Sequence, residues 1–379
     1  MQKFLCVLLV VNFISCSSER KKGTITIIKN VNFFDGEKYS ENIDIAFHNG
    51  FMVKAEEDEY EGTTIIDGKG KTIIPPLLNA HVHVWSKQDL LTAQNAGVFA
   101  TLDMHTTDYT AYSLRKYRDS TRYAFYYSAG PGATVPGGHG TQYGIAMPTI
   151  NDSVSPEKFV RDRIMFKSDY IKILREPSMK TINFEQTNQV IKTSHFLSKL
   201  CVAHVSVLSD AMRLGSQNID GFVHIWRRGA ITNDQADSLV RRKIFIIPTL
   251  YVIKKSLEII HREKTRKEYL SFDQVLNETR KLFKKGVPIL AGTDAPNFNF
   301  NYGSDLYVEL KLLSEAGLPN IEVLKAATTN ISKCFKLKEF GKLEIGKPAS
   351  FLMINGNPIK KIEDISKIEG IWKKGKRIK

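Results

Sequence analysis

Residues 73–84 read IIPPLLNAHVHV, an apolar run that ends in the histidine pair His81 and His83. Side chains two residues apart on a strand point to the same face, so a buried strand here would aim both imidazoles at one point. Two neutral imidazole nitrogens brought together in this way suit a metal ion. Two histidines that merely alternate on a half-buried strand give the same pattern, so the rest of the chain has to distinguish the two interpretations.

Short apolar stretches recur along the middle of the chain, and stretches of helical pattern separate them. We predict strands at 77–84, 98–104, 123–128, 169–174, 200–205, 221–225, 245–248 and 288–291. Strands that alternate with helices over a region of this size are typical of a (β/α)8 TIM barrel, which we expect over residues 75–337. Such a barrel keeps its chemistry at the carboxyl ends of its strands.

The segments 24–74 and 338–379 alternate and turn like parts of a small all-β unit. Neither segment can bury a core alone, because a few strands need a partner surface to be stable. We therefore expect the two segments to pair and to form a small β-sandwich domain from both termini.

The first residues have the pattern of an export signal, with a basic start at Lys3 and an apolar stretch over 4–14. This stretch is too short to span a bilayer as a mature helix. Residues 14–16 resemble the lipobox of bacterial lipoproteins, in which the cysteine is lipidated; a secretory signal with a chance cysteine is the alternative. We expect a signal peptide over 1–16, a tether over 17–23, and a membrane anchor on Cys16 in the cell envelope, periplasmic or at the surface.

The composition, 42% hydrophobic and 25% charged, is ordinary for a soluble globular protein. The net charge of +14 would suit nucleic acid or an anionic membrane surface. No cluster of lysine and arginine is interleaved with aromatic residues, so we expect no nucleic-acid binding. The sequence leaves a homo-oligomer open.

Residue types that bind metals follow several predicted strands. Lys172 lies inside an apolar strand, where a charged ammonium is costly unless it is neutralised or modified. His204 and His224 end the fifth and sixth strands, and Asp294 directly follows the eighth. Singly, each has a plainer explanation: a satisfied core histidine, a lysine that reaches solvent, or an aspartate that caps a helix. Together with the first histidine pair they would meet at one barrel mouth, which favours a metal site.

Along nearly its whole mature length the sequence resembles the amidohydrolase superfamily, in the branch of imidazolonepropionases and Xaa-Pro dipeptidases. Besides the residues above, the resemblance rests on GGHG at 137–140, GTD at 292–294, ELKLL at 309–313, EVLKAAT at 322–328 and FGKLEIGKPA at 340–349.

The resemblance implies a site with two divalent metal ions. His81, His83 and Asp294 would bind one ion, and His204 and His224 the other. Lys172, as a carbamate formed with carbon dioxide, would bridge them, and this modification turns a costly buried cation into an anionic ligand. Zinc suits these ligands best, with manganese, iron and cobalt left open.

The expected reaction is metal-dependent hydrolysis of a carbon–nitrogen bond. The ions would activate a water and polarise the carbonyl, and Asp294 would pass the water's proton to the leaving group. His139, in the glycine-rich loop, is expected to bind the substrate or the developing oxyanion. Arg227 and Tyr251, after the sixth and seventh strands, are expected to grip a substrate carboxylate.

A dipeptidase-like activity on a small-molecule or dipeptide substrate is favoured. The resembling mononuclear imidazolonepropionases lack the counterpart of Lys172, and export fits poorly with an intracellular step of histidine breakdown. The same site would also serve a cyclic amide, a lactone or an ester. A ligand-binding surface lipoprotein without catalysis is an alternative of another class, although such a role would not need Asp294 as a base. The remaining histidines fit no site, and we expect them to be structural or surface residues: His48, His105, His195 and His261.

Overall fold

The computed structural model describes residues 21–118, 120–262 and 268–379. The expected signal peptide over 1–16 and Cys16 lie outside the described residues. Of the expected tether, residues 21–23 are described, and they form the beginning of the first strand, β1 (Lys21–Phe34).

The two ends of the chain meet in one eight-stranded sheet, in the order β15-β14-β13-β5-β1-β2-β3 with β4 on β1. Met353 pairs with Ile73 and Leu352 with Ile74, so a C-terminal strand lies directly against an N-terminal one. The expected pairing of the ends is therefore present in one continuous sheet, and a sandwich of two facing sheets is not shown. Its strands are β1, β2 (Tyr39–His48), β3 (Phe51–Val53), β4 (Tyr60–Asp67), β5 (Lys71–Ile74), β13 (Phe351–Asn355), β14 (Ile368–Lys373) and β15 (Lys376–Arg377).

Seven short parallel strands form the centre of the α/β part. A three-stranded sheet holds β6 (Leu77–Val82), β7 (Val98–Asp103) and β8 (Phe125–Ser128); a four-stranded sheet holds β9 (Ile171–Leu174), β10 (Cys201–His204), β11 (Gly221–Val223) and β12 (Phe245–Ile247). Nearly every residue of these strands is buried, as expected for parallel strands that helices cover.

A closed barrel of eight strands is not shown. The segment 288–291, expected to be the eighth strand, makes a single bridge, Ile246 to Ile289, and Ala295 makes another to Val82. Pro288 has no N–H to donate, and the Ala291 N–H donates to Ala326 outside any strand, so no continuous ladder forms. A further single bridge links Ala133, in the segment after β8, to Ile173 of β9.

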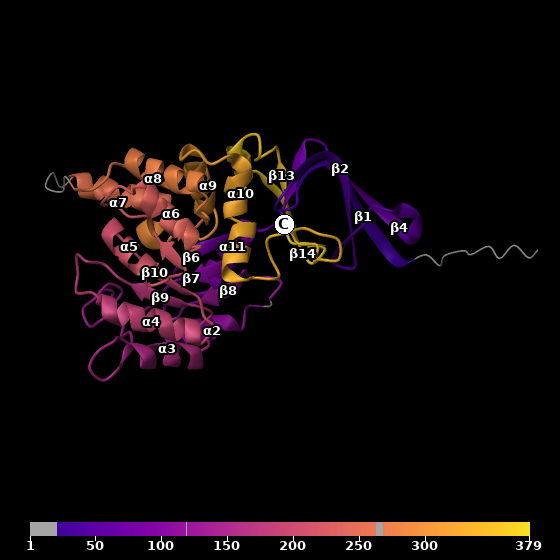
Figure 1. Ribbon diagram of the computed structural model, residues 1–379. Coiled ribbons are helices and arrows are strands. Elements are labelled where there is room, and N and C mark those ends of the chain that lie inside the picture. Colours follow the sequence, from indigo (N-terminus) through magenta and orange to yellow (C-terminus); the bar gives the residue numbers. More distant parts are fainter. Residues whose placement is uncertain (1–20, 119, 263–267) are drawn as a thin grey trace, which may run out of the picture.

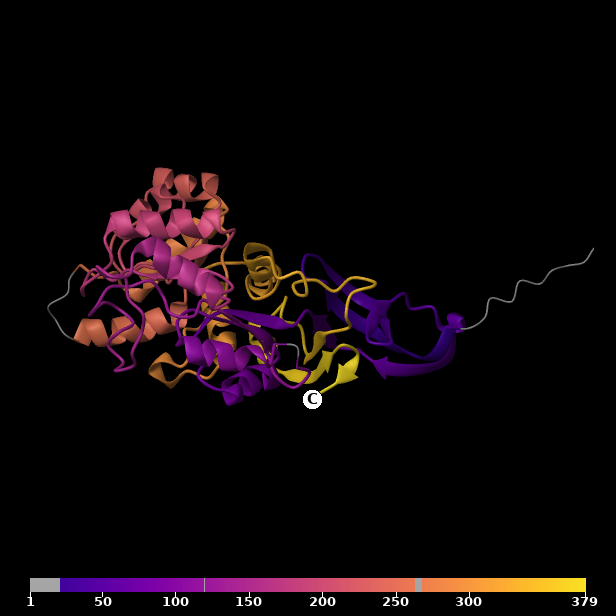
Figure 2. The same cartoon turned by 90° about the horizontal axis from the view of Figure 1, so that it is seen from below.

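Helices surround the two parallel sheets, and the terminal sheet lies beside them as a second lobe (Figures 1 and 2). Side-chain caps fix several helix starts, as where Ser155 accepts the N–H of Lys158. None of the helices in the described ranges is both long and apolar enough to span a membrane. They are α1 (Lys87–Asn95), α2 (Asp108–Arg115), α3 (Pro156–Met165), α4 (Phe184–Phe196), α5 (Leu208–Ser216), α6 (Asn233–Arg241), α7 (Leu250–Arg262), α8 (Phe272–Lys285), α9 (Asp305–Glu315), α10 (Asn320–Ala326) and α11 (Thr329–Phe335), with 3-10 turns η1 (Glu57–Glu59), η2 (Asn297–Asn299) and η3 (Ile362–Ser366).

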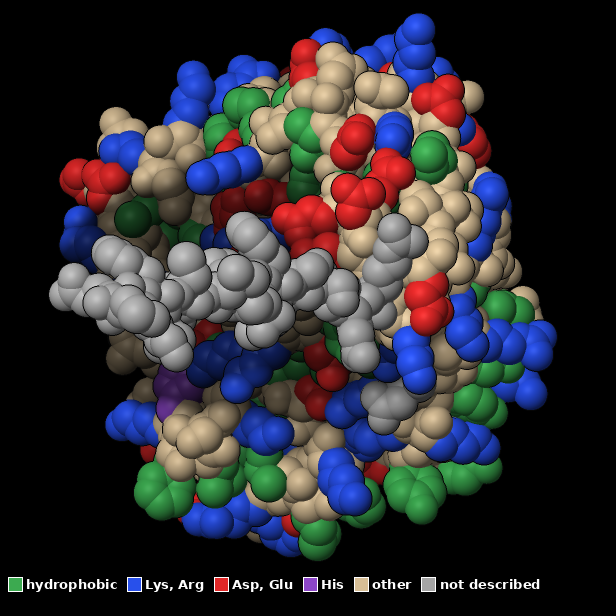
Figure 3. Space-filling model, turned by 90° about the vertical axis from the view of Figure 1, so that its right-hand side faces the viewer, with side chains coloured by type: hydrophobic (Ala, Val, Ile, Leu, Met, Phe, Trp, Pro, Cys, Tyr) green, Lys and Arg blue, Asp and Glu red, His purple; other side chains and the backbone are tan. Residues whose placement is uncertain are grey.

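The positive charge is dispersed on the face seen in Figure 3. Lysine and arginine side chains there are interspersed with aspartate and glutamate rather than gathered into one stripe. A stripe would be the electrostatic footprint of a nucleic-acid site.

Candidate metal centre

The histidine pair lies where β6 meets the segment that contains Asp294. The N–H of Asp294 donates to the carbonyl of His81, and the N–H of His83 donates to the carbonyl of Ala295. These backbone bonds hold the two segments side by side, so the three side chains share one space. Asp294 has φ +65°, a left-handed conformation that is costly for a residue with a side chain and that the surrounding contacts must maintain.

The three side chains nearly touch. His81 Nε2 lies 3.3 Å from His83 Nε2, and each nitrogen lies 3.0 Å from Asp294 Oδ1. Burial lowers the pKa of His81 to about 3. Burial alone would raise the pKa of Asp294, but the two histidines hold it well below its usual value. Asp294 is therefore an ionised carboxylate facing imidazole nitrogens, a donor set that suits a divalent cation.

Lys172, in β9, is buried under the same space, with a side chain 2% exposed. Its Nζ makes no hydrogen bond or ion pair with the part of the chain that the structure describes. Burial lowers the pKa of Lys172 to about 7, with Asp294 the one charge that opposes the shift. The unprotonated Lys172 amine is then populated near neutral pH.

His224 follows β11, and a hydrogen bond at its Nδ1 fixes the orientation of the ring. Thr249 Oγ1 lies 2.6 Å from His224 Nδ1 and 2.8 Å from the carbonyl of Pro248. The hydroxyl donates to the carbonyl, so it accepts the proton of His224 Nδ1, and Nε2 keeps a free lone pair. His83 is set in the same way, because its Nδ1 donates to the carbonyl of His105 at 2.9 Å.

Glu176 is a site residue that the sequence analysis missed. Its Oε2 lies 3.4 Å from His204 Nε2 and 3.3 Å from Arg227 Nη2. Burial would raise the pKa of Glu176, but hydrogen bonds from His204 and Ser178 hold it well below its usual value. With Nε2 donating to Glu176, the lone pair of His204 is on Nδ1. An acidic residue two positions after β9 was a usable signal, of the kind that identified Asp294.

His105 was assigned to no site, and the structure corrects this. Its Nδ1 accepts the N–H of Gly132 at 2.9 Å, and its Nε2 donates to the carbonyl of Gly140 at 3.2 Å. His105 thus holds the glycine-rich loop in place while its own carbonyl orients His83. The other three unassigned histidines make contacts away from this site: His48, His195 and His261.

His139 is the loop residue nearest to the histidine cluster. Its ring centroid lies 4.4 Å from that of His204. Burial, with His204 adding to it, lowers the pKa of His139 to about 2. The Gln142 amide donates to His139 Nδ1 at 3.4 Å, so the proton of this neutral ring is on Nε2.

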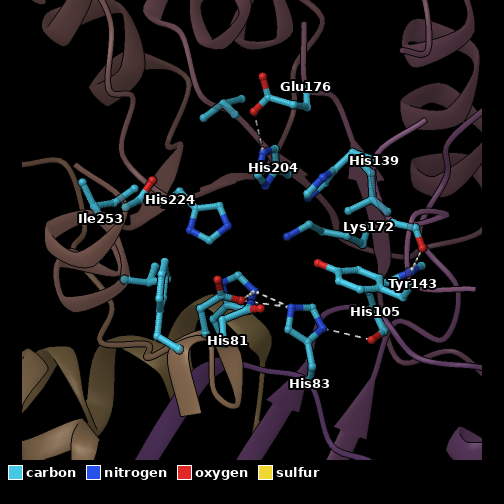
Figure 4. Close-up of a pocket in the computed structure, with 18 of the residues that line it drawn as sticks. His81, His83, His105, His139, Tyr143, Lys172, Glu176, His204, His224 and Ile253 are labelled. Carbon is cyan, nitrogen blue, oxygen red and sulfur yellow. Dashed lines mark hydrogen bonds and ion pairs between the residues drawn. The ribbon is translucent and has the colours of Figure 1, made fainter. Parts of the chain in front are cut away.

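These side chains line one cavity of about 530 Å³. In Figure 4 the rings of His81, His83, His204 and His224 and the Lys172 amine surround a common centre. Tyr251 does not line the cavity; its ring stacks on Phe300, with the centroids 4.1 Å apart. The remaining wall is largely apolar and aromatic: Trp85, Tyr143, Met179, Val252, Ile253 and Phe298.

The residues at the centre fit a metal site. One ligand atom from each of His81, His224 and Asp294 lies within 4.8 Å of the other two. The buried His81 Nδ1 has no hydrogen-bond partner within the described ranges. Neutral imidazoles with oriented lone pairs and one ionised carboxylate are the donors that zinc and similar ions prefer.

Comparison with known proteins agrees with this geometry. The sequence pattern of the amidohydrolase family matches residues 72–378. The chain belongs to the amidohydrolase family. Members of this family generally use divalent metal ions, and the protein is accordingly a metal-dependent hydrolase. Comparison of this amidohydrolase with the curated proteins found no match.

Solved structures share the fold. A Xaa-Pro dipeptidase with bound methionine is 19% identical with a TM-score of 0.76, covering 94% of this chain and 100% of its own. A molinate hydrolase is 15% identical at 0.76, with 94% and 95% covered, and the A. niger ochratoxinase is 17% identical at 0.76, with 95% and 96% covered. At these identities the similarity establishes the fold of this amidohydrolase and not its substrate.

Proposed function

We propose that this amidohydrolase is a dinuclear hydrolase with a dipeptidase-like activity on amide bonds. His81, His83 and Asp294 would hold one ion, and His204 and His224 the other, with zinc as the expected metal. The observation that carries the proposal is the convergence of these donors on one cavity, with the lone pairs of three imidazoles fixed by hydrogen bonds from behind.

Lys172 would join the two halves of the site as a carbamate. Carbon dioxide adds to an unprotonated amine, and the lowered pKa of Lys172, about 7, supplies that form at neutral pH. The modification would also turn a buried cation without a partner into an anion that the metal ions would stabilise.

The side chains around the centre have complementary roles. Bound ions would lower the pKa of a water and polarise the scissile carbonyl. Asp294, ionised and beside the histidines, would accept the water's proton and deliver it to the leaving nitrogen. His139, with its proton on Nε2, would donate a hydrogen bond to the carbonyl oxygen as negative charge develops there.

The substrate would be a compact amide with a carboxylate and an apolar side chain. Arg227 lines the cavity and keeps its guanidinium in place through Ser256 at 2.8 Å and Glu176. A substrate carboxylate would bind there. The aromatic and aliphatic wall would accept an apolar residue, and the one acidic side chain besides Asp294 in this wall, Glu176, is already paired. The basic side chain of a substrate would therefore find no unpaired carboxylate in this wall.

Two structural points belong to the same proposal. We infer that the two parallel sheets and the segment 288–291 are parts of one (β/α)8 barrel over 75–337, supported by the bridge between Ile246 and Ile289 and by the N–H of Ala80, which donates to the carbonyl of Ala291. The segments 24–74 and 338–379 would form the second domain.

Export with a lipid anchor on Cys16 rests on the sequence pattern alone. Replacing the cysteine in Cys16→Ser should move the protein from the membrane fraction to the soluble fraction. An unchanged distribution would contradict the anchor.

The function is tested by metal content together with peptide cleavage. Protein produced with zinc and bicarbonate should carry about two ions per protomer and release amino acids from some members of a dipeptide pool. One ion with an unmodified Lys172 would contradict the dinuclear site, and two ions without cleavage would contradict the peptidase.

Asp294→Asn should lower kcat by about 10²–10⁴-fold, with metal content measured on the same samples. The exposed Asp234→Asn, in the first turn of α6, should leave turnover unchanged. Full turnover of Asp294→Asn with metals bound would show that Asp294 is not the base.

A further inference from the structure

A second cavity lies where the terminal sheet packs against the floor of the α/β part. Its volume is about 160 Å³, too small for a drug-sized ligand. Phe99 from β7, Phe125 from β8 and Phe340 form its apolar wall, with the rings of Phe125 and Phe340 packed edge to face at 5.0 Å. This cavity is separate from the metal centre, because it lies at the amino ends of the strands whose carboxyl ends carry the histidines.

Lys373, the last residue of β14, lines this cavity with a side chain 3% exposed. Its Nζ donates to Gln94 Oε1 and to the carbonyl of Tyr123, both at 2.8 Å. The rings of Phe99 and Phe125 flank it at 5.2 and 5.1 Å. An ammonium has three N–H donors, and the third has no oxygen or nitrogen acceptor within the described ranges.

When Lys373 is protonated, its charge has no counter-charge among the described residues. Lys373 forms no ion pair with a described carboxylate, and neighbouring Lys374 makes the position more positive. Lys342, Lys347 and Lys374 line the cavity against one acidic residue, Glu339. The amide Nε2 of Gln94, the same side chain that accepts from Lys373, is also buried without a partner in the described structure, but Gln94 does not line the cavity. Buried donors normally have an acceptor from the protein, an ordered water or an ion, so the third N–H of Lys373 leaves a place for one in this cavity.

We propose that this cavity binds a small monocarboxylate with an apolar body, whose carboxylate accepts the third N–H of Lys373 and whose body lies against the three phenylalanine rings. A carboxylate would supply the missing counter-charge in a low-dielectric position, where such a pair is strong. A zwitterionic amino acid would bring a second ammonium among the lysines, so the products of peptide cleavage fit poorly.

The test is calorimetric titration of the metal-loaded protein with benzoate. We expect saturable binding of benzoate at constant ionic strength, and none of benzamide, which has the same shape without the charge. Lys373→Met should weaken this binding at least tenfold, whereas Lys376→Met, exposed on β15 of the same hairpin, should change it less than twofold. Arg227→Met removes a carboxylate-binding group of the catalytic cavity and should leave the Lys373-dependent event intact.

A second variant separates loss of the binding cavity from misfolding of Lys373→Met. Phe340→Trp keeps the ammonium but fills the cavity, so it should also abolish benzoate binding. Equal binding of benzamide and benzoate, or benzoate binding retained by either cavity variant, would overturn the proposal. Loss of binding in Arg227→Met would do so too, since it would place the carboxylate at the metal centre. None of these outcomes depends on peptide cleavage.

Discussion

At the scale of single residues, a substitution of Lys172 tests the proposed dinuclear site against a mononuclear one. If Lys172 bridges two ions as proposed, Lys172→Ala should reduce bound metal to less than half and turnover at least 100-fold, because that ligand would be lost. Propionate should restore part of both, since its carboxylate can enter the space that the side chain leaves. Metal analysis and dipeptide turnover, with and without propionate, measure these effects.

The control for this variant is Lys167→Ala, an exposed lysine just after α3, which should keep both metal and turnover. If Lys172→Ala kept two ions and full activity, neither the carbamate nor the bridge would be needed.

Side chains at strand ends that meet in the cavity could be predicted from the sequence, whereas residues that contact the site through their backbone or through another residue could not. Lys172 and Asp294 stand out because Lys172 lies within an apolar strand and Asp294 directly follows an apolar segment, where charged side chains are unusual. His105 works through its carbonyl and through Gly140, thirty-five positions away, and no sequence pattern records such contacts. Tyr251 was expected at the site because it closely follows a strand, but its ring stacks on Phe300 and does not line the cavity.

At the scale of elements, Glu309 of α9 anchors the start of α7. Its two carboxylate oxygens accept the N–H groups of Leu250 and Tyr251, each at 2.9 Å, and Thr249 directly before them orients His224. In Glu309→Gln one of these buried N–H groups would face an amide NH2, so the free energy of unfolding should fall by about 1–3 kcal/mol. Denaturant titration measures the change.

The control for this prediction comes from the same helix. Glu315→Gln, at the exposed end of α9, should change stability by less than about 0.5 kcal/mol. Equal midpoints for wild type and Glu309→Gln would show that α7 does not depend on this anchor. The ELKLL motif at 309–313 was noted from resemblance; its first residue has this physical reason to be acidic.

Element types were easier to predict than pairing. The expected strands correspond to β6–β12, each shorter than expected by one or two residues, because apolar runs continue past the last ladder bond. The eighth segment has the same apolar pattern, yet its N–H donors go partly to Ala326, which lies thirty-five residues further on. The terminal strands were recognised from alternation, but alternation does not say whether they form one sheet or two.

At the scale of the whole molecule, Lys373 connects the two lobes, and its ionisation should make stability depend on pH. Burial lowers the pKa of Lys373 to about 7, whereas an unfolded lysine keeps its usual value of about 10.4. Between these values the unfolded chain binds a proton that the folded chain does not, so the free energy of unfolding should rise with pH. The contribution is at most about 1.4 kcal/mol per pH unit. Below pH 7 both states are protonated and the cost of the buried charge is fully present.

Denaturant titrations at pH 7, 8 and 9 measure this effect as the difference between wild type and Lys373→Met. The free energy of unfolding of wild type, minus that of Lys373→Met, should increase as pH rises, because methionine has no proton to release. Lys376→Met, on the exposed strand of the same hairpin, should follow wild type at every pH. Benzoate bound beside Lys373 would keep the ammonium charged, so it should flatten the wild-type curve. Parallel curves for wild type and Lys373→Met would mean that the ammonium stays protonated in the fold, with the Gln94 and Tyr123 oxygens sufficient to hold it.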